Sequence, residues 1–106
     1  MNGAEFTASS AGRLLRQFDI KPRKGLGQNF LISEGVVRRI IDAADLSEQD
    51  VVIEVGAGLG TLTRHLAQQA GQVIALEVDQ RLLPLLHQTL ANNSRVEIVH
   101  GDVLSI

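Results

Sequence analysis

The sequence contains no cysteine, which excludes a disulfide framework and any metal site built on thiolates. Its three histidines, His65, His87 and His100, are not spaced as metal ligands, so metal catalysis is not expected. No apolar run approaches the roughly 20 residues needed to cross a bilayer, and the first residues lack the basic-then-apolar order of a secretory signal. We therefore expect a cytoplasmic protein with no membrane partner.

Positive charge is scarce outside the first 41 residues. Residues 1–41 carry seven basic and three acidic side chains, a net charge of +4, whereas residues 42–106 carry three basic and nine acidic ones, a net charge of −6. A basic leader on an acidic body suits a chain that approaches a polyanion with one end and holds a small cationic or neutral ligand with the other. A solvated charged surface would produce the same pattern.

The length of 106 residues and the 44% hydrophobic content are enough for one modest core. Residues 1–20 are predicted to be a flexible leader with one short amphipathic helix, carried by Leu14, Leu15 and Phe18. Residues 21–106 are predicted to be part of a ligand-binding domain. It opens with a helix over 34–44, because Ser33 is a good N-cap. One face of this helix carries Val36, Val37, Ile40, Ile41 and Ala44.

Three strands are predicted after that helix, at 51–55, 73–77 and 96–99. The first reads VVIEV, a β-branched run typical of a strand buried on both faces. Helices are expected between the strands. The first runs from about 59 to 70 and stops at Gly71, and the second opens at Asp79, with Pro84 tolerated only in its first turn.

This β-α-β-α-β order predicts an α/β fold in which parallel strands lie in the order 3-2-1, the N-terminal half of a Rossmann-like sheet. A fourth strand beside the first would complete such a sheet, and the sequence does not contain one. The edge of strand 51–55 is therefore predicted to be open and to mediate self-association, unless the N-terminal segment folds back to cover it.

A glycine-rich turn follows the first strand, in the stretch Glu54 to Gly60, EVGAGLG. Glycine at 56 and 58 removes the β-carbons that would hold the backbone away from a ligand, and the N-terminus of the next helix turns unpaired N–H groups toward the same space. A nucleotide-type ligand fits across such a turn. An ordinary tight turn would show the same glycines.

Acidic residues end the next two strands. Glu77 lies 21 residues after Gly56, close to the spacing expected for a carboxylate that accepts hydrogen bonds from ribose hydroxyls. Asp102 follows the third strand, where an adenine amino group needs an acceptor. The alternatives are a solvated strand-end carboxylate for Glu77 and an ordinary turn aspartate for Asp102.

The turn fits a dinucleotide imperfectly. Gly60 follows Gly58 by two residues, whereas a dinucleotide fingerprint places the third glycine three residues on, where this sequence has Thr61. Glu54 would also repel a pyrophosphate, but it would attract the ammonium group of a methionine moiety. These features favour S-adenosylmethionine over NAD as the cofactor.

Upstream, residues 24–31 read KGLGQNFL and place two amides and an aromatic side chain between glycines and a helix cap. Such a segment is suited to fold over a ligand as a lid, with Gln28 and Asn29 supplying hydrogen bonds and Phe30 an apolar contact. The alternative is that Phe30 only anchors the loop to the core.

Taken together, KGLGQNFL, EVGAGLGTLT, ALEVD and GDVL resemble the ribosomal RNA adenine dimethyltransferase family, over about 85 residues from Lys21 to the end. The resemblance implies a class I methyltransferase fold and transfer of two methyl groups to each of two adjacent adenosines near the 3′ end of small-subunit ribosomal RNA, in ribosome biogenesis. It assigns cofactor contacts to Asn29, Leu31, Gly56, Glu77 and Asp102. The turn itself adds Gly58, where the missing β-carbon lets the backbone approach the ligand. The Lys-Gly-Leu-Gly lead-in and residues 59–62 look more like this housekeeping enzyme than the related macrolide-resistance methylases.

The sequence departs from the family by lacking its catalytic motif, Asn-(Leu/Ile)-Pro-(Tyr/Phe), and its C-terminal helical domain. In the family this motif positions the adenine amine and stacks on the flipped base. We therefore assign no catalytic residue here and expect the chain to be a cofactor-binding part that is inactive alone. Small-subunit ribosomal RNA or a pre-ribosomal subunit is the expected partner, contacted through Lys21, Arg23 and Lys24. The alternatives are an RNA-binding module without catalysis and an NAD-binding half-domain.

Overall fold

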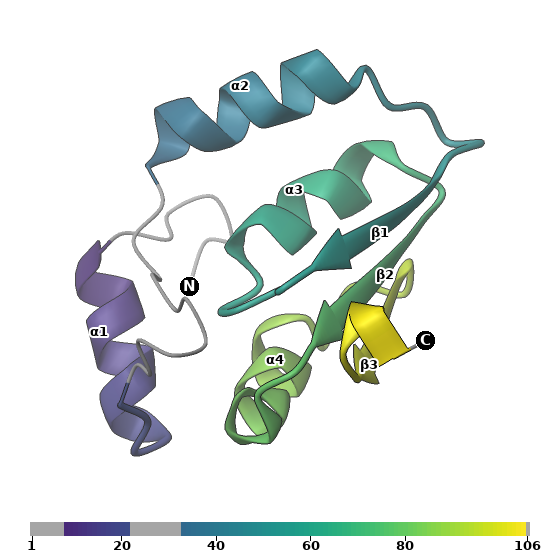
Figure 1. The fold of residues 1–106 in the computed structure, drawn as a ribbon. Coiled ribbons are helices and arrows are strands. Elements are labelled where there is room, and N and C mark those ends of the chain that lie inside the picture. Colours follow the sequence, from purple (N-terminus) through teal and green to yellow (C-terminus); the bar gives the residue numbers. More distant parts are fainter. Residues whose placement is uncertain (1–7, 22–32, 106) are drawn as a thin grey trace.

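A three-stranded parallel sheet forms the centre of the fold in a computed structural model, which describes residues 8–21 and 33–105, with side chains from Arg13 onward (Figure 1). The strands are β1 (Val51–Val55), β2 (Gln72–Glu77) and β3 (Val96–His100), and they lie in the order β1-β2-β3. Val55 lies opposite Leu76, and Glu77 lies opposite His100. The predicted strands, their direction and their order are confirmed.

The helices that connect the strands also follow the prediction closely. The elements are α1 (Ala8–Gln17), α2 (Glu34–Ala44), α3 (Thr61–Gln69) and α4 (Leu83–Thr89), with the short 3-10 turns η2 (Gln80–Leu82) and η3 (Val103–Ser105). Asp79 accepts a hydrogen bond from the N–H of Arg81 and so caps η2. Pro84 lies in the first turn of α4, where its missing N–H has no intrahelical partner to lose.

Two apolar clusters hold these helices against one face of the sheet. In the first, Val37 and Ile41 of α2 pack with α3 and with Val73 of β2. In the second, the buried leucines of η2 and α4 pack on Ala75 of β2. Partly buried side chains of α1 pack against this second cluster, and Ile20, just after α1, belongs to it. The segment from residue 14 to 20 therefore contacts the core.

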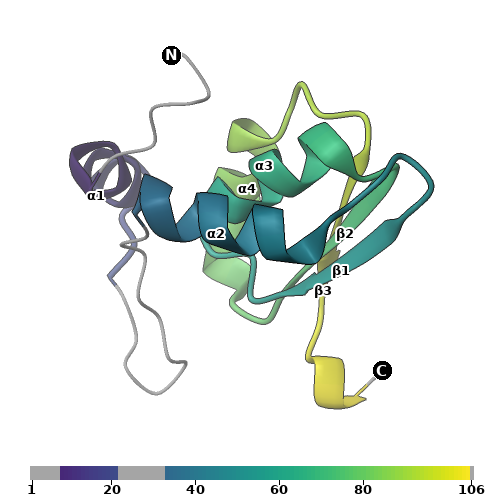
Figure 2. The same ribbon diagram turned by 90° about the horizontal axis from the view of Figure 1, so that it is seen from above.

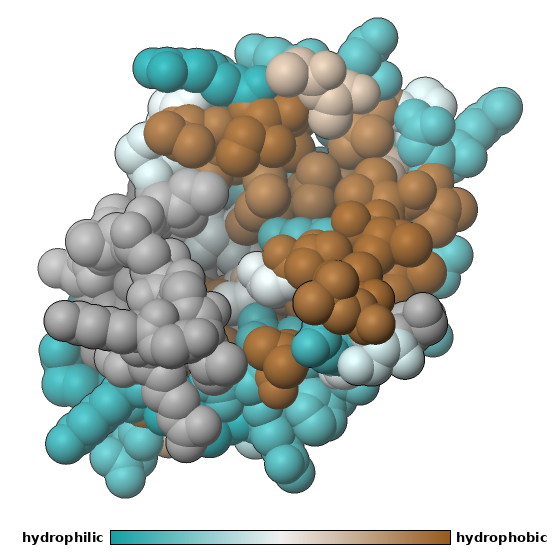
Figure 3. Space-filling view, in the orientation of Figure 1, coloured by the Kyte–Doolittle hydropathy of each residue, from teal (hydrophilic) through white to brown (hydrophobic). Residues whose placement is uncertain are grey.

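The prediction that β1 is buried on both faces is wrong. The side chains of Val51, Ile53 and Val55 are 60–61% exposed. Right-handed crossovers from β1 to β2 and from β2 to β3 place α3 and α4 on the same side of the sheet, and α2 lies on that side as well (Figure 2). In the described part of the chain no helix covers the opposite face. Its apolar side chains gather over β1 and the C-terminal turn (Figure 3).

Helix α2 begins and ends as expected but buries a narrower face. The Ser33 hydroxyl accepts a hydrogen bond from the Val36 N–H at 3.1 Å, which confirms the predicted cap. Val37 and Ile41 are buried, whereas Val36 and Ile40 are exposed. The difference arises because α2 packs mainly on α3, so only a narrow stripe of its surface meets a neighbour.

Helix α3 ends at Gln69 with Ala70 as its C-cap, so Gly71 directly follows the end of the helix, close to the predicted boundary. The glycine also allows the backbone of another segment to pass close by. A β-carbon at Gly71 would lie 2.1 Å from the carbonyl oxygen of Glu48, so the backbone would have to move. We expect Gly71→Ala to lower the free energy of unfolding by about 1–3 kcal/mol, measured by chemical denaturation. Gly35→Ala in α2 is the control, because its nearest neighbour would be 4.0 Å away. Equal stability of the two variants would contradict the steric explanation.

Candidate functional site

The predicted site residues that the structure describes lie along one edge of the sheet, where the three parallel strands end (Figure 1). The turn from Gly56 to Gly60 follows β1, Glu77 is the last residue of β2, and Asp102 follows β3 by two residues. Ligands of open α/β sheets bind at this carboxyl edge. The fold therefore brings together, at one edge, features that are up to 46 residues apart in sequence.

The turn is held in a conformation that requires glycine. Gly56, Gly58 and Gly60 have φ angles of 79°, 59° and 80°, in the left-handed region that other residues rarely adopt. The N–H groups of Gly56 and Ala57 both donate to the carbonyl oxygen of Leu76, at 2.9 and 3.0 Å, which ties the turn to β2. A β-carbon at Gly56 would meet no described atom within 4 Å. The described residues therefore leave open space beside the turn, where a ligand is expected.

Glu77 connects this turn to the second strand. One carboxylate oxygen accepts a hydrogen bond from the Gly58 N–H at 2.8 Å, and the other accepts one from the Asp79 N–H at 2.9 Å. The side chain is only 4% exposed, so it is not a solvated strand-end carboxylate. Each oxygen has a second acceptor position, which leaves capacity for two ribose hydroxyls. The structure thus joins Gly58 and Glu77, and the ribose contact itself stays a prediction.

Glu54 is a second buried carboxyl group beside the turn. It lies on the same sheet face as Glu77, two register positions earlier, and the hydroxyl of Thr63 in α3 donates a hydrogen bond to it. Burial raises the pKa of Glu54 from its ordinary 4.5 to about 7; the Thr63 hydroxyl opposes this rise and the charge of Glu77 adds to it. Sequence reasoning missed Thr63. The available signal was a hydroxyl in the first turn of the helix that follows the glycines.

Arg81 connects the backbone of Lys21 to this edge of the sheet. Its guanidinium binds the Asp79 carboxylate at 2.6 Å and donates to the carbonyl oxygen of Lys21 at 2.9 Å. Asp79 in turn donates its N–H to Glu77. Lys21, the described member of the predicted RNA contacts, is therefore anchored through its backbone close to the candidate site, with an exposed side chain.

Asp102 lies at the carboxyl edge of the sheet, as predicted, but its carboxylate accepts a hydrogen bond within its own turn. Its carboxylate accepts a hydrogen bond from the Leu104 N–H at 2.9 Å, and its side chain is exposed. The neighbouring Gly101 donates its N–H to the carbonyl oxygen of Glu77 at 3.1 Å, so the two strand ends stay paired. This geometry agrees with an ordinary turn aspartate and leaves the adenine contact a prediction. Asn29, Leu31, Arg23 and Lys24 lie outside the described residues.

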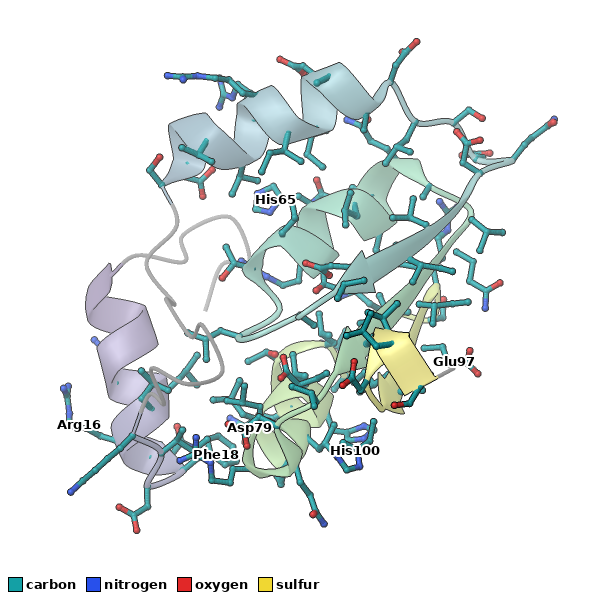
Figure 4. All side chains as sticks on the ribbon, viewed as in Figure 1. Arg16, Phe18, His65, Asp79, Glu97 and His100 are labelled. Atoms are coloured by element: carbon teal, nitrogen blue, oxygen red, sulfur yellow. The ribbon has the colours of Figure 1, made fainter. Side chains whose placement is uncertain are left out.

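A separate hollow of about 360 Å³ lies between α2 and α3. It is lined by Glu34, Arg38, Asp42, His65 and others, and His65 points into the space between the two helices (Figure 4). One ring nitrogen of His65 lies 2.9 Å from the carbonyl oxygen of Thr61, and the other lies 3.9 Å from the Glu34 carboxylate. These polar contacts join α2 to the start of α3, and we assign them a structural role.

The sheet order and the glycine turn at its carboxyl edge define a class I methyltransferase fold, and solved structures agree. The chain is similar to the 23S rRNA methyltransferase ErmE, with a TM-score of 0.69 and 38% identity, covering 74% of this chain and 32% of that one. It is also similar to an RNA methyltransferase from Salinibacter ruber solved with S-adenosyl-L-homocysteine, with a TM-score of 0.64 and 25% identity, covering 71% of this chain and 52% of that one.

A family model for ribosomal RNA adenine dimethylase matches residues 20–106, and the chain belongs to this family. One relative is the ribosomal RNA small subunit methyltransferase A of Natranaerobius thermophilus, 42% identical over 101 residues, which are 95% of this chain and 33% of the relative. The chain thus spans about a third of the length of the curated relatives it matches. No helix in the described ranges is long and apolar enough to cross a membrane.

Proposed function

We propose that this chain binds S-adenosylmethionine at the carboxyl edge of its sheet, as the cofactor-binding part of an enzyme that dimethylates two adjacent adenosines near the 3′ end of small-subunit ribosomal RNA. The observation that carries the proposal is the buried carboxylate of Glu77 bound to the glycine turn through Gly58. Family membership supplies the substrate class, and it supports a place for the protein in ribosome biogenesis in the cytoplasm.

The chemistry of the donors and acceptors fits this cofactor. Glu77 offers acceptor positions for the two ribose hydroxyls, and the glycines at 56 and 58 let the backbone approach the ligand. Glu54 places a second carboxyl group at the edge, where it disfavours a pyrophosphate and suits a cationic ligand. When bound, the cofactor supplies the methyl group. The described residues bind and orient it, and they include none of the Asn-Pro-aromatic motif that would position the target amine.

Calorimetric titration of this chain with S-adenosylmethionine, NAD and a small-subunit ribosomal RNA fragment tests the proposal. We expect binding of S-adenosylmethionine and none of NAD, with no methyl transfer by the chain alone above a no-enzyme control. Binding of NAD in preference would establish the dinucleotide alternative. Binding of RNA with no affinity for either cofactor would establish an RNA-binding module.

The basic residues at positions 21–24 support RNA as the partner. The Lys21 side chain is exposed, and its backbone is anchored beside the candidate site by Arg81. Arg23 and Lys24 follow directly in sequence. A basic segment starting at the cofactor edge is well placed to hold the phosphates that flank a target adenosine.

We expect reversal of the charges at Lys21, Arg23 and Lys24 to weaken RNA binding and to flatten its dependence on salt. Removal of one phosphate-binding cation should reduce the slope of log affinity against log salt concentration by about 0.7–0.9, because fewer counterions are released. Fluorescence anisotropy with an RNA fragment over a salt series measures both quantities. Arg38→Glu and Arg39→Glu on the exposed side of α2 are controls for net charge. If the variant with reversed charges at Lys21, Arg23 and Lys24 kept its RNA affinity and salt dependence, these residues would form only a solvated surface.

A further inference from the structure

The two buried carboxyl groups beside the glycine turn, those of Glu54 and Glu77, differ in the hydrogen bonds that they accept. Glu77 accepts hydrogen bonds from two backbone N–H groups, which can only donate. Glu54 accepts one hydrogen bond, from the hydroxyl of Thr63, and a hydroxyl is able to face either a charged or a protonated carboxyl group. Both side chains lie on the face of the sheet that α3 covers, and both are buried.

Buried carboxylates on the same face of two adjacent strands repel one another when both are ionised, and the group with fewer hydrogen-bond donors takes up a proton more readily. From β2, the charge acting on Glu54 is that of Glu77. On α3, the neighbours of Thr63 are Arg64, whose Coulombic partner is Glu34, and His65, which pairs with the same Glu34. Beyond Glu77, Asp79 is paired with Arg81. Among the residues that the structure describes, no cation pairs with the Glu54 carboxyl group.

We propose that Glu54 carries a proton in the ligand-free site and releases it to solvent when a cationic adenosine derivative binds, so that the site selects cationic over neutral ligands more strongly as pH rises. This inference rests on the proposed function, because it concerns the same site. A positive group on the ligand supplies the missing partner and stabilises the carboxylate, whereas a neutral ligand leaves the proton in place. Thr63 is then a positioning residue that eases the ionisation.

The test compares S-adenosylmethionine, which is cationic, with 5′-methylthioadenosine, which has the same nucleoside and a neutral thioether. Calorimetry of this chain at pH 6.5, in buffers of different ionisation enthalpy, counts the protons exchanged. With a Glu54 pKa of about 7 we expect release of roughly three quarters of a proton with the cationic ligand and none with the neutral one. Well below pH 7, affinity for the cationic ligand should rise about tenfold per pH unit.

Variants assign the proton to its residue. Glu54→Gln should abolish the release and the pH dependence, and Glu97→Gln, at an exposed carboxylate on β3, should change neither. Thr63→Val keeps the shape of the buried side chain but removes the hydroxyl, so it should move the rise in affinity to higher pH. Thr63→Ser should restore the original profile. A merely structural role for Thr63 would change stability without moving the pH profile.

A measurement without ligand checks where the proton resides. Between pH 4.5 and about 7 the unfolded chain ionises Glu54 while the folded chain keeps it protonated, so the free energy of unfolding should fall as pH rises through this window. Glu54→Gln should flatten that fall. Identical pH profiles for the two proteins would overturn the proposal, and so would binding of both ligands with equal proton exchange, which leaves the proposed function intact. Binding of neither ligand would overturn both.

Discussion

Replacing Glu77 by alanine is expected to weaken S-adenosylmethionine binding, in this chain and in a complete enzyme that contains it. The expected loss is about 1.5–3 kcal/mol for each charged hydrogen bond removed, or roughly 10- to 150-fold in the dissociation constant. The reason is that Glu77 is buried at the end of β2 and presents its remaining acceptor positions at the edge where the ribose is predicted to lie. Calorimetric titration measures the effect.

Glu77 also supports the protein itself, so the loss of affinity has to be separated from a loss of folding. Its removal leaves the N–H groups of Gly58 and Asp79 without their acceptor, which is expected to cost about 1–3 kcal/mol each if they stay buried. Circular dichroism during chemical denaturation shows whether the variant is folded under the binding conditions. Glu97→Ala, at an exposed position on β3, is the matched control. Unchanged affinity in a folded Glu77→Ala variant would remove this residue from the site.

The chain is expected to self-associate through β1, and a charge placed on that strand should dissociate it. Because the Gly56 N–H points to β2, strand alternation directs the backbone groups of Val51, Ile53 and Val55 to the other edge. In the described part of the chain no strand pairs with that edge, and the same three side chains expose an apolar surface. An open, apolar, uncharged edge readily pairs with another chain.

Sedimentation velocity over a range of concentrations should therefore show dimers or larger species of the unmodified chain, and mostly monomer for Ile53→Lys. Val36→Lys is the control, because Val36 is also an exposed β-branched apolar residue but lies on α2, away from the edge of the sheet. A stable monomer whose amide hydrogens at Val51, Ile53 and Val55 exchange rapidly would show an edge that is open but unpaired, contrary to this expectation.

The features that sequence predicted correctly are those fixed by local chemistry. Ser33 caps α2 because its hydroxyl reaches the third residue on, and Pro84 lies in the first turn of α4 because it has no N–H to donate. The strand order follows from the handedness of the crossovers. The spacing of Gly56 and Glu77 predicted that the glycine turn and this carboxylate lie at the same end of the sheet, and the hydrogen bond from Gly58 to Glu77 agrees with that placement. Their contact with a cofactor stays a prediction.

The features that sequence missed depend on which surfaces meet in three dimensions. The run VVIEV is apolar at four of its five positions, and this composition does not reveal whether a second layer covers the strand. Thr63 and Glu54 meet only because α3 packs back over β1, and the need for glycine at 71 arises from the carbonyl oxygen of Glu48 on another segment. Contacts of this kind have no signature in a local pattern.

The hydrogen bonds of Arg81 connect the proposed RNA-binding segment to the proposed cofactor site. Its guanidinium donates hydrogen bonds to the carbonyl oxygen of Lys21 and to the carboxylate of Asp79. The N–H of Asp79 in turn donates a hydrogen bond to Glu77. If RNA engages the segment at Lys21 and the cofactor engages Glu77, both ligands act on one connected set of bonds. Such coupling is thermodynamically reciprocal, so whatever factor the cofactor applies to RNA affinity, RNA must apply to cofactor affinity. A substitution at Arg81 should then reduce the coupling while leaving each separate affinity much less affected.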